Sequence, residues 1–215
     1  MNFISLLCIF TKNFLILALD KRSGTLLYGK ALDTLLDESY YKYMKPQTRG
    51  VIVHYENEIL LMEEILQKLN EINETKNSFN SCSITTTLQM FTPEKVKERL
   101  FDIVFEYFDF GAFLPINPQV AIQNFLKINN LCKSPFQLIV ESGHSATYIA
   151  PFFDDEIINY ACKRLEVGGK LLTNQMKELV SFRFLNMKSE YRTMNQMKEE
   201  MCFFSENFKE DMKAP

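Results

Sequence analysis

The residues of this chain with the clearest potential for chemistry are Ser142 and Gly143, which Ser145 closely follows. They lie between two short apolar runs, residues 136–141 and 147–153, so the pattern predicts two strands joined by a tight turn. A turn that contains glycine can point backbone N–H groups at an anion such as phosphate. A β-hairpin turn without a ligand explains the same residues, and the local pattern alone favours that simpler interpretation.

Two helix-start signals precede this turn. Thr92 and Asn117 each stand directly before a proline, and such a polar side chain can cap free N–H groups while the proline loses no helical hydrogen bond. We therefore expect one helix from residue 93 to about Phe108 and a second helix through Leu126. Further upstream, residues 56–72 have apolar side chains at helical spacing.

A polar stretch rich in Asn, Ser, Thr and Lys, residues 73–81, follows that first helix and predicts a surface loop at a subdomain joint. Downstream of the turn we expect one strand over residues 157–165. Thr173 is predicted to cap a helix that ends near Phe184. Thr193, with a glutamine three residues later, resembles a capping box that opens the last helix. The order of elements predicts a mixed α/β fold.

The composition excludes several classes of protein. The chain has 215 residues, of which 47% are hydrophobic, which is enough for a buried core. Its 24 basic and 27 acidic residues give a net charge of only -3, so no overall attraction to nucleic acid or an anionic membrane is expected. The five cysteines are odd in number and widely spaced, and neither of the two histidines has a ligand at metal-binding spacing. We predict a reducing compartment, no structural zinc site and no metal ligands.

The N-terminus contains two apolar runs, residues 3–10 and 14–19, with Lys12 between them. A signal peptide is one interpretation, but no basic residue precedes the first run and no convincing cleavage site follows the second. A continuous membrane-spanning helix is disfavoured because Lys12 would lie in its middle. A buried strand or non-native sequence is the favoured interpretation.

Four segments, taken in chain order, carry a more specific pattern: residues 120–123 (VAIQ), 138–151 (LIVESGHSATYIAP), 165–173 (LEVGGKLLT) and 197–203 (MKEEMCF). Together they resemble the central stretch of the actin superfamily, in which a VAIQ helix precedes a D-S-G phosphate hairpin, a glycine turn ending in L-T and a K-E-x-x-C helix. The segment VGGKLLTN, residues 167–174, is most similar to the actin-related protein 6 subfamily. The resemblance implies an α/β, actin-like fold of the ribonuclease H-like, ATPase-domain type. It implies a partial actin-like domain over residues 45–215, with residues 1–44 as an uncertain apolar segment.

The resemblance also implies roles for single residues on the reacting side of a nucleotide. Gln123 falls where the family has a glutamine that positions the attacking water. Glu141 falls where the family has an aspartate near magnesium, and its longer side chain makes hydrolysis doubtful. Both are interpreted as remnants, and no catalytic residue is expected.

Five further residues match positions that bind the nucleotide in the family. Ser142 and Gly143 match the phosphate-loop pair, Gly169 matches the glycine beside the ribose, and Lys198 and Glu199 match the pair that contacts adenosine. As alternatives, these residues form a hairpin turn, a strand-to-helix turn and a solvated charge pair.

Two parts of the family's nucleotide cleft have no counterpart here. Its first phosphate loop, a D-x-G stretch, is not found before Tyr40, and its C-terminal half would begin after Pro215. The resemblance therefore assigns no definite cofactor to this chain, and ATP with magnesium is the alternative.

The expected function is that of a non-catalytic subunit of a nuclear chromatin-remodelling complex, of the SWR type that exchanges histone variants. The expected partners are other subunits of that complex, with histones or nucleosomes as further contacts, and neither a membrane nor a specific nucleic-acid sequence. Nuclear localisation is expected, with the cytoplasm as the alternative. An ATP-binding actin-like protein and a truncated gene product without function are the other interpretations.

Overall fold

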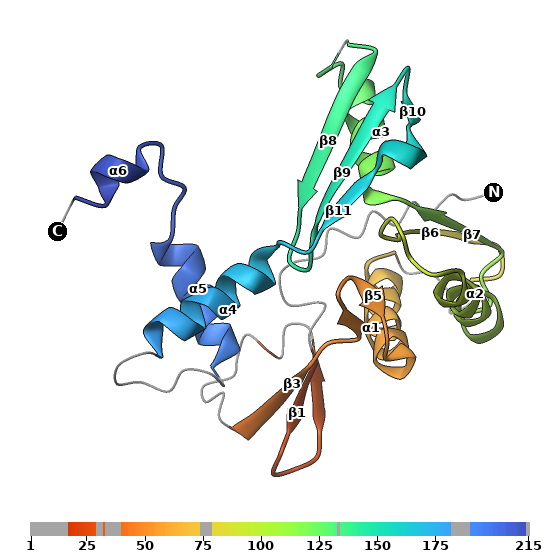
Figure 1. Ribbon diagram of the computed structural model, residues 1–215. Coiled ribbons are helices and arrows are strands. Elements are labelled where there is room, and N and C mark those ends of the chain that lie inside the picture. Colours follow the sequence, from red (N-terminus) through yellow and green to blue (C-terminus); the bar gives the residue numbers. More distant parts are fainter. Residues whose placement is uncertain are drawn as a thin grey trace. The chain divides into compact units, whose positions relative to one another are not determined.

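The computed structural model describes residues 17–28, 32, 40–73, 79–132, 134–181 and 190–213, with the backbone alone for residues 70–73 (Figure 1). It divides into two compact units, of which the first comprises Met1–Ile139 and Ala150–Ala161, and the second Val140–Ile149 and Cys162–Pro215. The apolar run of residues 3–10, the middle of the polar stretch 73–81 and the predicted helix end near Phe184 lie outside the described residues.

Three short strands begin the described chain. β1 (Leu17–Asp20) is central in an antiparallel sheet, between β2 (Leu26–Tyr28) and β3 (Tyr41–Met44). Leu17 and Ala18 have no exposed surface. The part of the second apolar run that the structure describes is therefore a buried strand, which is one of the two favoured interpretations. A small hairpin of β4 (Gln47–Thr48) and β5 (Val51–Ile52) then leads to the first helix.

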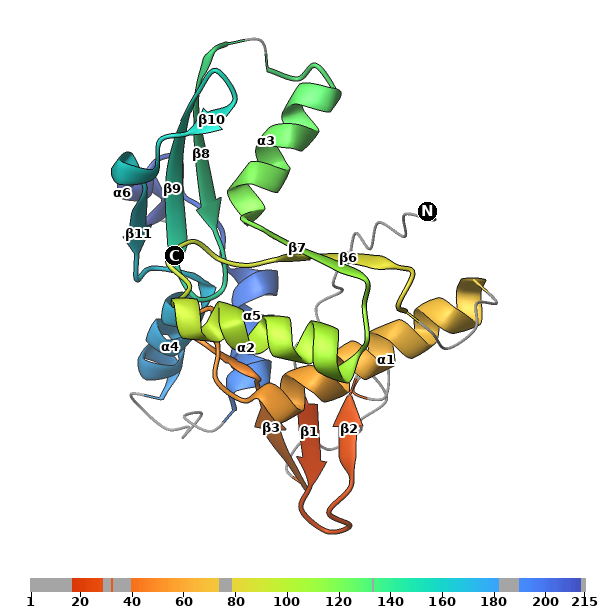
Figure 2. The ribbon, with the colours of Figure 1, turned by 90° about the vertical axis from the view of Figure 1, so that its right-hand side faces the viewer.

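The first unit is built around a parallel strand pair, β6 (Ser83–Thr87) and β7 (Ala112–Ile116). α2 (Glu94–Asp102) and the π-helical turn η3 (Ile103–Tyr107) connect these two strands. Figure 2 shows α2 and α1 (Tyr55–Asn73) on the same side of the strand pair. One buried apolar cluster of the unit consists of Leu66 from α1, Ile84 from β6, Val104 from η3 and Phe110 from the segment before β7.

The predicted helix starts are confirmed, but the predicted capping by Thr92 is wrong. α2 begins at Glu94, directly after Pro93, and the Thr92 hydroxyl donates a hydrogen bond of 2.6 Å to the carbonyl oxygen of Gln89. The side chain therefore stabilises the preceding turn instead of the helix N–H groups. α3 (Pro118–Ile128) begins with its proline at the first position, as predicted, but the Asn117 side chain makes no capping hydrogen bond, so its predicted capping is wrong as well.

The predicted pair of strands is confirmed as β8 (Phe136–Ser142) and β9 (Thr147–Phe153), which pair with each other. The predicted single strand over residues 157–165 is wrong. It consists of β10 (Glu156–Ile157), the 3₁₀ turn η4 (Asn159–Ala161) and β11 (Lys163–Leu165). Ile157 pairs with Phe152 and Lys163 with Ile149, so five residues face only two on β9 and must leave the strand.

The second unit contains α4 (Gly169–Val180), α5 (Tyr191–Met201) and the short α6 (Phe208–Asp211). The predicted caps of the first two helices are wrong. Thr173 lies inside α4, where its hydroxyl is 2.9 Å from the carbonyl oxygen of Gly169 four residues earlier, and Thr193 lies inside α5. Met194, next to Thr193, is completely buried, as an inward-facing residue of an amphipathic helix is. In the described part of the chain, no helix is both long and apolar enough to cross a membrane.

Candidate functional site

The Ser142–Gly143 turn is closed by its own hydrogen bonds. The Gly143 N–H donates to the carbonyl oxygen of Ala146 at 3.0 Å, and the hydroxyl oxygens of Ser142 and Thr147 are 3.0 Å apart. Thr147 in turn donates to the carbonyl oxygen of Val167 at 2.7 Å. The turn is therefore tied to the segment that precedes α4.

The N-terminus of α4 is occupied by this same turn. A helix N-terminus has free N–H groups and a partial positive charge, which is why it can bind phosphate. Here the Gly169 N–H donates to the carbonyl oxygen of Gly143 at 3.0 Å, and the Lys170 N–H donates to that of His144 at 2.8 Å. Backbone carbonyls of the hairpin thus take the place that an anion would need.

Lys198 joins α5 to α4. Its ammonium group donates to Thr173 Oγ1 at 3.0 Å and to Asn195 Oδ1 at 2.9 Å, and it lies 3.4 Å from the carbonyl oxygen of Gly169. Since an ammonium has three donors, these three acceptors account for all of them. Thr173 has no exposed surface, so the contact is central to the packing of the two helices.

Two further contacts lie near Lys198. Glu199 accepts a hydrogen bond of 2.9 Å from the side-chain amide of Asn195. The hydroxyl of Tyr191 is 3.3 Å from Nε2 of His144, the residue that follows Gly143 in the turn. Burial raises the pKa of the Tyr191 hydroxyl above its ordinary range, so this group is a neutral hydrogen-bonding partner at neutral pH. The helix pair is thereby connected to the turn at a second point.

Glu141 ends β8 next to Ser142, in the second unit. Burial raises the pKa of the Tyr148 hydroxyl, Arg164 opposes this rise, and the charge of Glu141 adds to it. The Glu141 carboxylate is therefore close enough to Tyr148 to affect its ionisation.

Gln123 lies in the first unit and is only 1% exposed. Its side-chain amide donates to Oδ1 of Asp155 at 2.9 Å, and Lys127 forms an ion pair with the other carboxylate oxygen. The hydrogen bond from Lys127, followed by that from Gln123, lowers the pKa of Asp155. The Gln123 amide N–H group therefore connects α3 to the turn after β9.

The structure brings together only part of the predicted site. The second unit contains Ser142, Gly143, Gly169, Lys198 and Glu199, and within it the Lys198 ammonium lies 3.4 Å from the carbonyl oxygen of Gly169. Reasoning from the sequence missed the residues that engage these side chains, Thr173, Asn195 and Asp155. The first two follow a helical rule that could have revealed them, because Asn195 is three residues before Lys198 and Thr173 is four after Gly169.

The described residues do not fit a tightly held ATP with magnesium. The N–H groups of Gly143, Gly169 and Lys170, and the ammonium of Lys198, all donate to groups of the protein itself. Phosphate binding depends on such donors being directed at the ligand. Within the described ranges, no cluster of three or more His, Cys, Asp or Glu side chains could hold a metal ion.

Comparisons with known proteins identify relatives over most of this chain. The profile of the family described as Actin matches residues 22–215. "Actin-related protein 6" of Dictyostelium discoideum is 29% identical over 205 residues, which cover 87% of this chain and 41% of the relative. The proteins of the same name from Drosophila melanogaster and Arabidopsis thaliana are 28% and 27% identical, cover 86% and 89% of this chain, and are themselves covered to 47% and 46%.

These matches confirm the predicted α/β actin-like fold and the predicted similarity to actin-related protein 6. The chain spans less than half the length of these relatives.

Proposed function

Because this chain belongs to the actin family, we propose that it acts as a non-catalytic assembly subunit of a nuclear chromatin-remodelling complex of the SWR type. Its partners are other subunits of that complex, with histones or nucleosomes as further contacts. The proposal is supported by the similarity to proteins named actin-related protein 6 and by the VGGKLLTN segment, residues 167–174.

One observation carries the non-catalytic part of this proposal. The groups that would touch a nucleotide are engaged with the protein itself: Lys198 with Thr173 and Asn195, and Gln123 with Asp155. Donors that hydrogen-bond within the protein are not directed at a nucleotide, and catalysis depends on donors that are directed at the reacting groups.

Affinity purification tests the proposed complex. The tagged chain, expressed in its own cells at its normal level, is expected to co-purify with subunits of a chromatin-remodelling complex and to be found in the nucleus. Conventional actin with the same tag serves as the control for general actin-fold contacts. Recovery of cytoskeletal or secretory proteins alone would contradict the proposal.

We predict that the purified chain does not hydrolyse ATP. Glu141 places its carboxylate about one bond further from the backbone than aspartate would, and a displacement of about 1 Å can cost a positioned reaction roughly a hundredfold in rate. The amide of Gln123, which would have to align the water, is held by Asp155. Phosphate release is measured with ATP and magnesium on the parent chain.

Two variants decide whether any activity comes from this site. Gln123→Ala removes the water-positioning candidate, and Glu141→Asp restores the residue type that the family has. Turnover in the parent that disappears in Gln123→Ala would contradict the prediction and would favour an enzyme.

Binding of ATP without turnover is the second candidate function. One specific observation favours it. The ammonium of Lys198 is 3.4 Å from the carbonyl oxygen of Gly169, and both residues match positions that contact the nucleotide in the family. Titration with a fluorescent ATP analogue, on the parent and on Lys198→Met, distinguishes this candidate from a scaffold without nucleotide. Saturable binding that Lys198→Met abolishes would favour it.

A further inference from the structure

Three aromatic rings form a cluster on the outer side of α2 and η3, in the first unit. η3 continues α2 with helical backbone angles, and its residues Ile103 and Val104 are buried. Phe101 and Phe105, four residues apart, are instead 37% and 40% exposed. Phe113 of β7 meets both edge to face, with ring centroids 5.1 Å from Phe101 and 6.5 Å from Phe105. We call Phe101, Phe105 and Phe113 the aromatic ridge.

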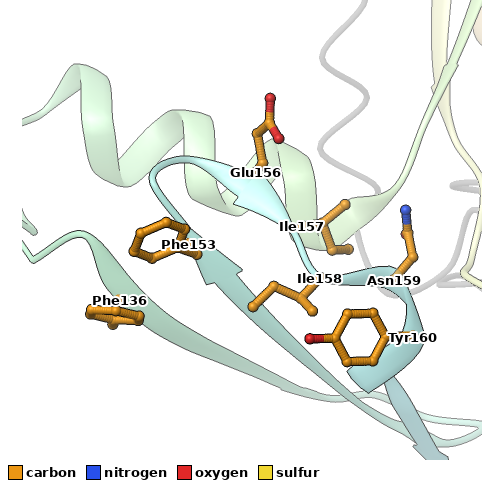
Figure 3. Close-up of a pocket in the computed structure, with 7 residues that line it drawn as sticks. All are labelled: Phe136, Phe153, Glu156, Ile157, Ile158, Asn159 and Tyr160. Carbon is orange, nitrogen blue, oxygen red and sulfur yellow. The ribbon is translucent and has the colours of Figure 1, made fainter.

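The aromatic ridge is separate from the other features of this chain that could hold a ligand. An open pocket of about 570 Å³ lies beside the turn between β9 and β10, and its lining includes Phe136, Phe153 and Tyr160 (Figure 3). None of the three rings of the ridge belongs to that lining or to the candidate nucleotide site. Large aromatic side chains that are exposed together are typical of surfaces that bind another protein.

The segment around the aromatic ridge is acidic. Residues 98–109 contain four carboxylates and one basic side chain, so this segment alone has a net charge of -3, as large as that of the whole chain. Two of the three basic side chains of α2 are engaged in ion pairs, Lys97 with Glu94 and Arg99 with Asp102. The field at the ridge therefore attracts positive charge.

Two of these carboxylates flank the exposed rings. Glu98 lies about one helical turn before Phe101, and Glu106 directly follows Phe105. Both carboxylates are exposed, and neither forms an ion pair with a described residue. Like charges that meet at an interface oppose binding, which disfavours nucleic acid, an anionic membrane and a second copy of this surface. The complementary occupant carries apolar and cationic side chains together.

We propose that the aromatic ridge binds an amphipathic helix of a partner protein whose apolar side chains are flanked by lysine or arginine. Apolar side chains three and four residues apart pack on Phe101 and Phe105, since the ridges of one helix fit the grooves of another. The cationic groups lie at Glu98 and Glu106, while their aliphatic stems cover the rings. Cations are also attracted to the faces of such rings. This surface binds whether or not the chain enters the proposed remodelling complex.

The test uses a synthetic helical peptide of about five turns, with leucine at every third or fourth residue and arginine beside the leucines. Fluorescence anisotropy measures its binding to the whole chain, and we expect saturable binding that weakens with added salt. Phe105→Ala is expected to weaken binding about tenfold, as loss of an aromatic anchor does. Glu98→Gln is expected to weaken it about threefold, as loss of one exposed ion pair does. Because Glu98 is exposed, this variant tests the charge without disturbing the packing, which circular dichroism checks.

Matched controls decide where the peptide binds. Tyr160→Ala removes an exposed ring of the separate pocket, whereas Leu179→Ala and Glu178→Gln change exposed side chains of α4 in the second unit. All three are expected to bind like the parent, and a peptide with glutamate in place of arginine is expected to bind at least about fivefold more weakly.

Four outcomes would overturn the proposal. They are the absence of saturable binding, equal binding of the two peptides, parent-like binding by Phe105→Ala, and a loss of binding confined to Tyr160→Ala, which would place the peptide in the pocket. Self-association of the chain that Phe105→Ala abolishes would also contradict it, in favour of a second copy as the occupant.

Discussion

Replacing Gly168 with alanine is expected to lower the free energy of unfolding by about 2–4 kcal/mol. A Cβ atom at this position would lie 2.8 Å from the carbonyl oxygens of Gly143 and His144 and 2.9 Å from the backbone nitrogen of Ala146. All three atoms belong to the backbone of the hairpin turn, so no flexible side chain can move aside. The turn would have to separate from α4, which would lose the two hydrogen bonds donated by Gly169 and Lys170.

Gly169→Ala is the matched control for this variant. At Gly169 the nearest atoms to an added Cβ are Lys198 Nζ at 3.6 Å and His144 Cα at 3.7 Å, which are ordinary contacts. Since Gly169 is the first residue of α4, alanine is expected to leave the stability unchanged or to raise it by up to about 1 kcal/mol. Urea unfolding followed by circular dichroism measures both variants and the parent. Equal stability of the two variants would show that the close approach at Gly168 does not hold the turn and helix together.

The sequence predicts this fold best where the signal is local. Pro93 and Pro118 mark the helix starts because the restricted backbone of proline acts at its own position. The hairpin was predictable for a similar reason, since two apolar runs flank a serine and a glycine. The cap of α4 was not predictable, because its acceptors come from the hairpin, 26 residues before their donors, and make a cap by Thr173 unnecessary.

Long-range contacts also explain what was missed in the candidate site. Gln123 and Asp155 are 32 residues apart, and neither has a sequence pattern that points to the other. Their contact depends on how α3 packs near the turn after β9. The parallel pair β6 and β7 was missed for the same reason, because its partners are joined through a crossover helix. Family resemblance supplied the residue types of the site, whereas the geometry decides what those residues contact.

The second large effect of a substitution on stability is expected at Glu58, in the first turn of α1. Burial raises the pKa of its carboxyl to about 7, and a hydrogen bond with the Gln47 side chain opposes this rise. Although part of the side chain reaches solvent, the Oε2 atom has almost no exposed surface. The carboxyl is therefore close to half protonated at neutral pH.

The direction in which the free energy of unfolding changes with pH follows from the pKa of Glu58 in the folded and in the unfolded chain. The unfolded chain releases this proton near its ordinary pKa of 4.5, whereas the folded chain keeps it up to about pH 7. The stability that the proton on Glu58 contributes to the folded state is therefore fully present below about pH 4.5 and is lost as the pH rises through about 7. At pH 8 the folded protein holds a buried carboxylate, which costs on the order of 3 kcal/mol.

Glu58→Gln is expected to remove this cost, because a neutral amide of nearly the same shape replaces the charged group. The variant should be more stable than the parent by on the order of 3 kcal/mol at pH 8, with the difference shrinking towards zero below pH 5. Urea unfolding of both chains across this pH range measures the difference directly, so the titration of other groups cancels. Glu56→Gln, an exposed change in the same helical turn, controls for the general effect of removing a negative charge near a helix N-terminus. A parent and a Glu58→Gln variant whose stabilities stay parallel from pH 5 to pH 8 would mean that this carboxyl ionises normally in the folded protein.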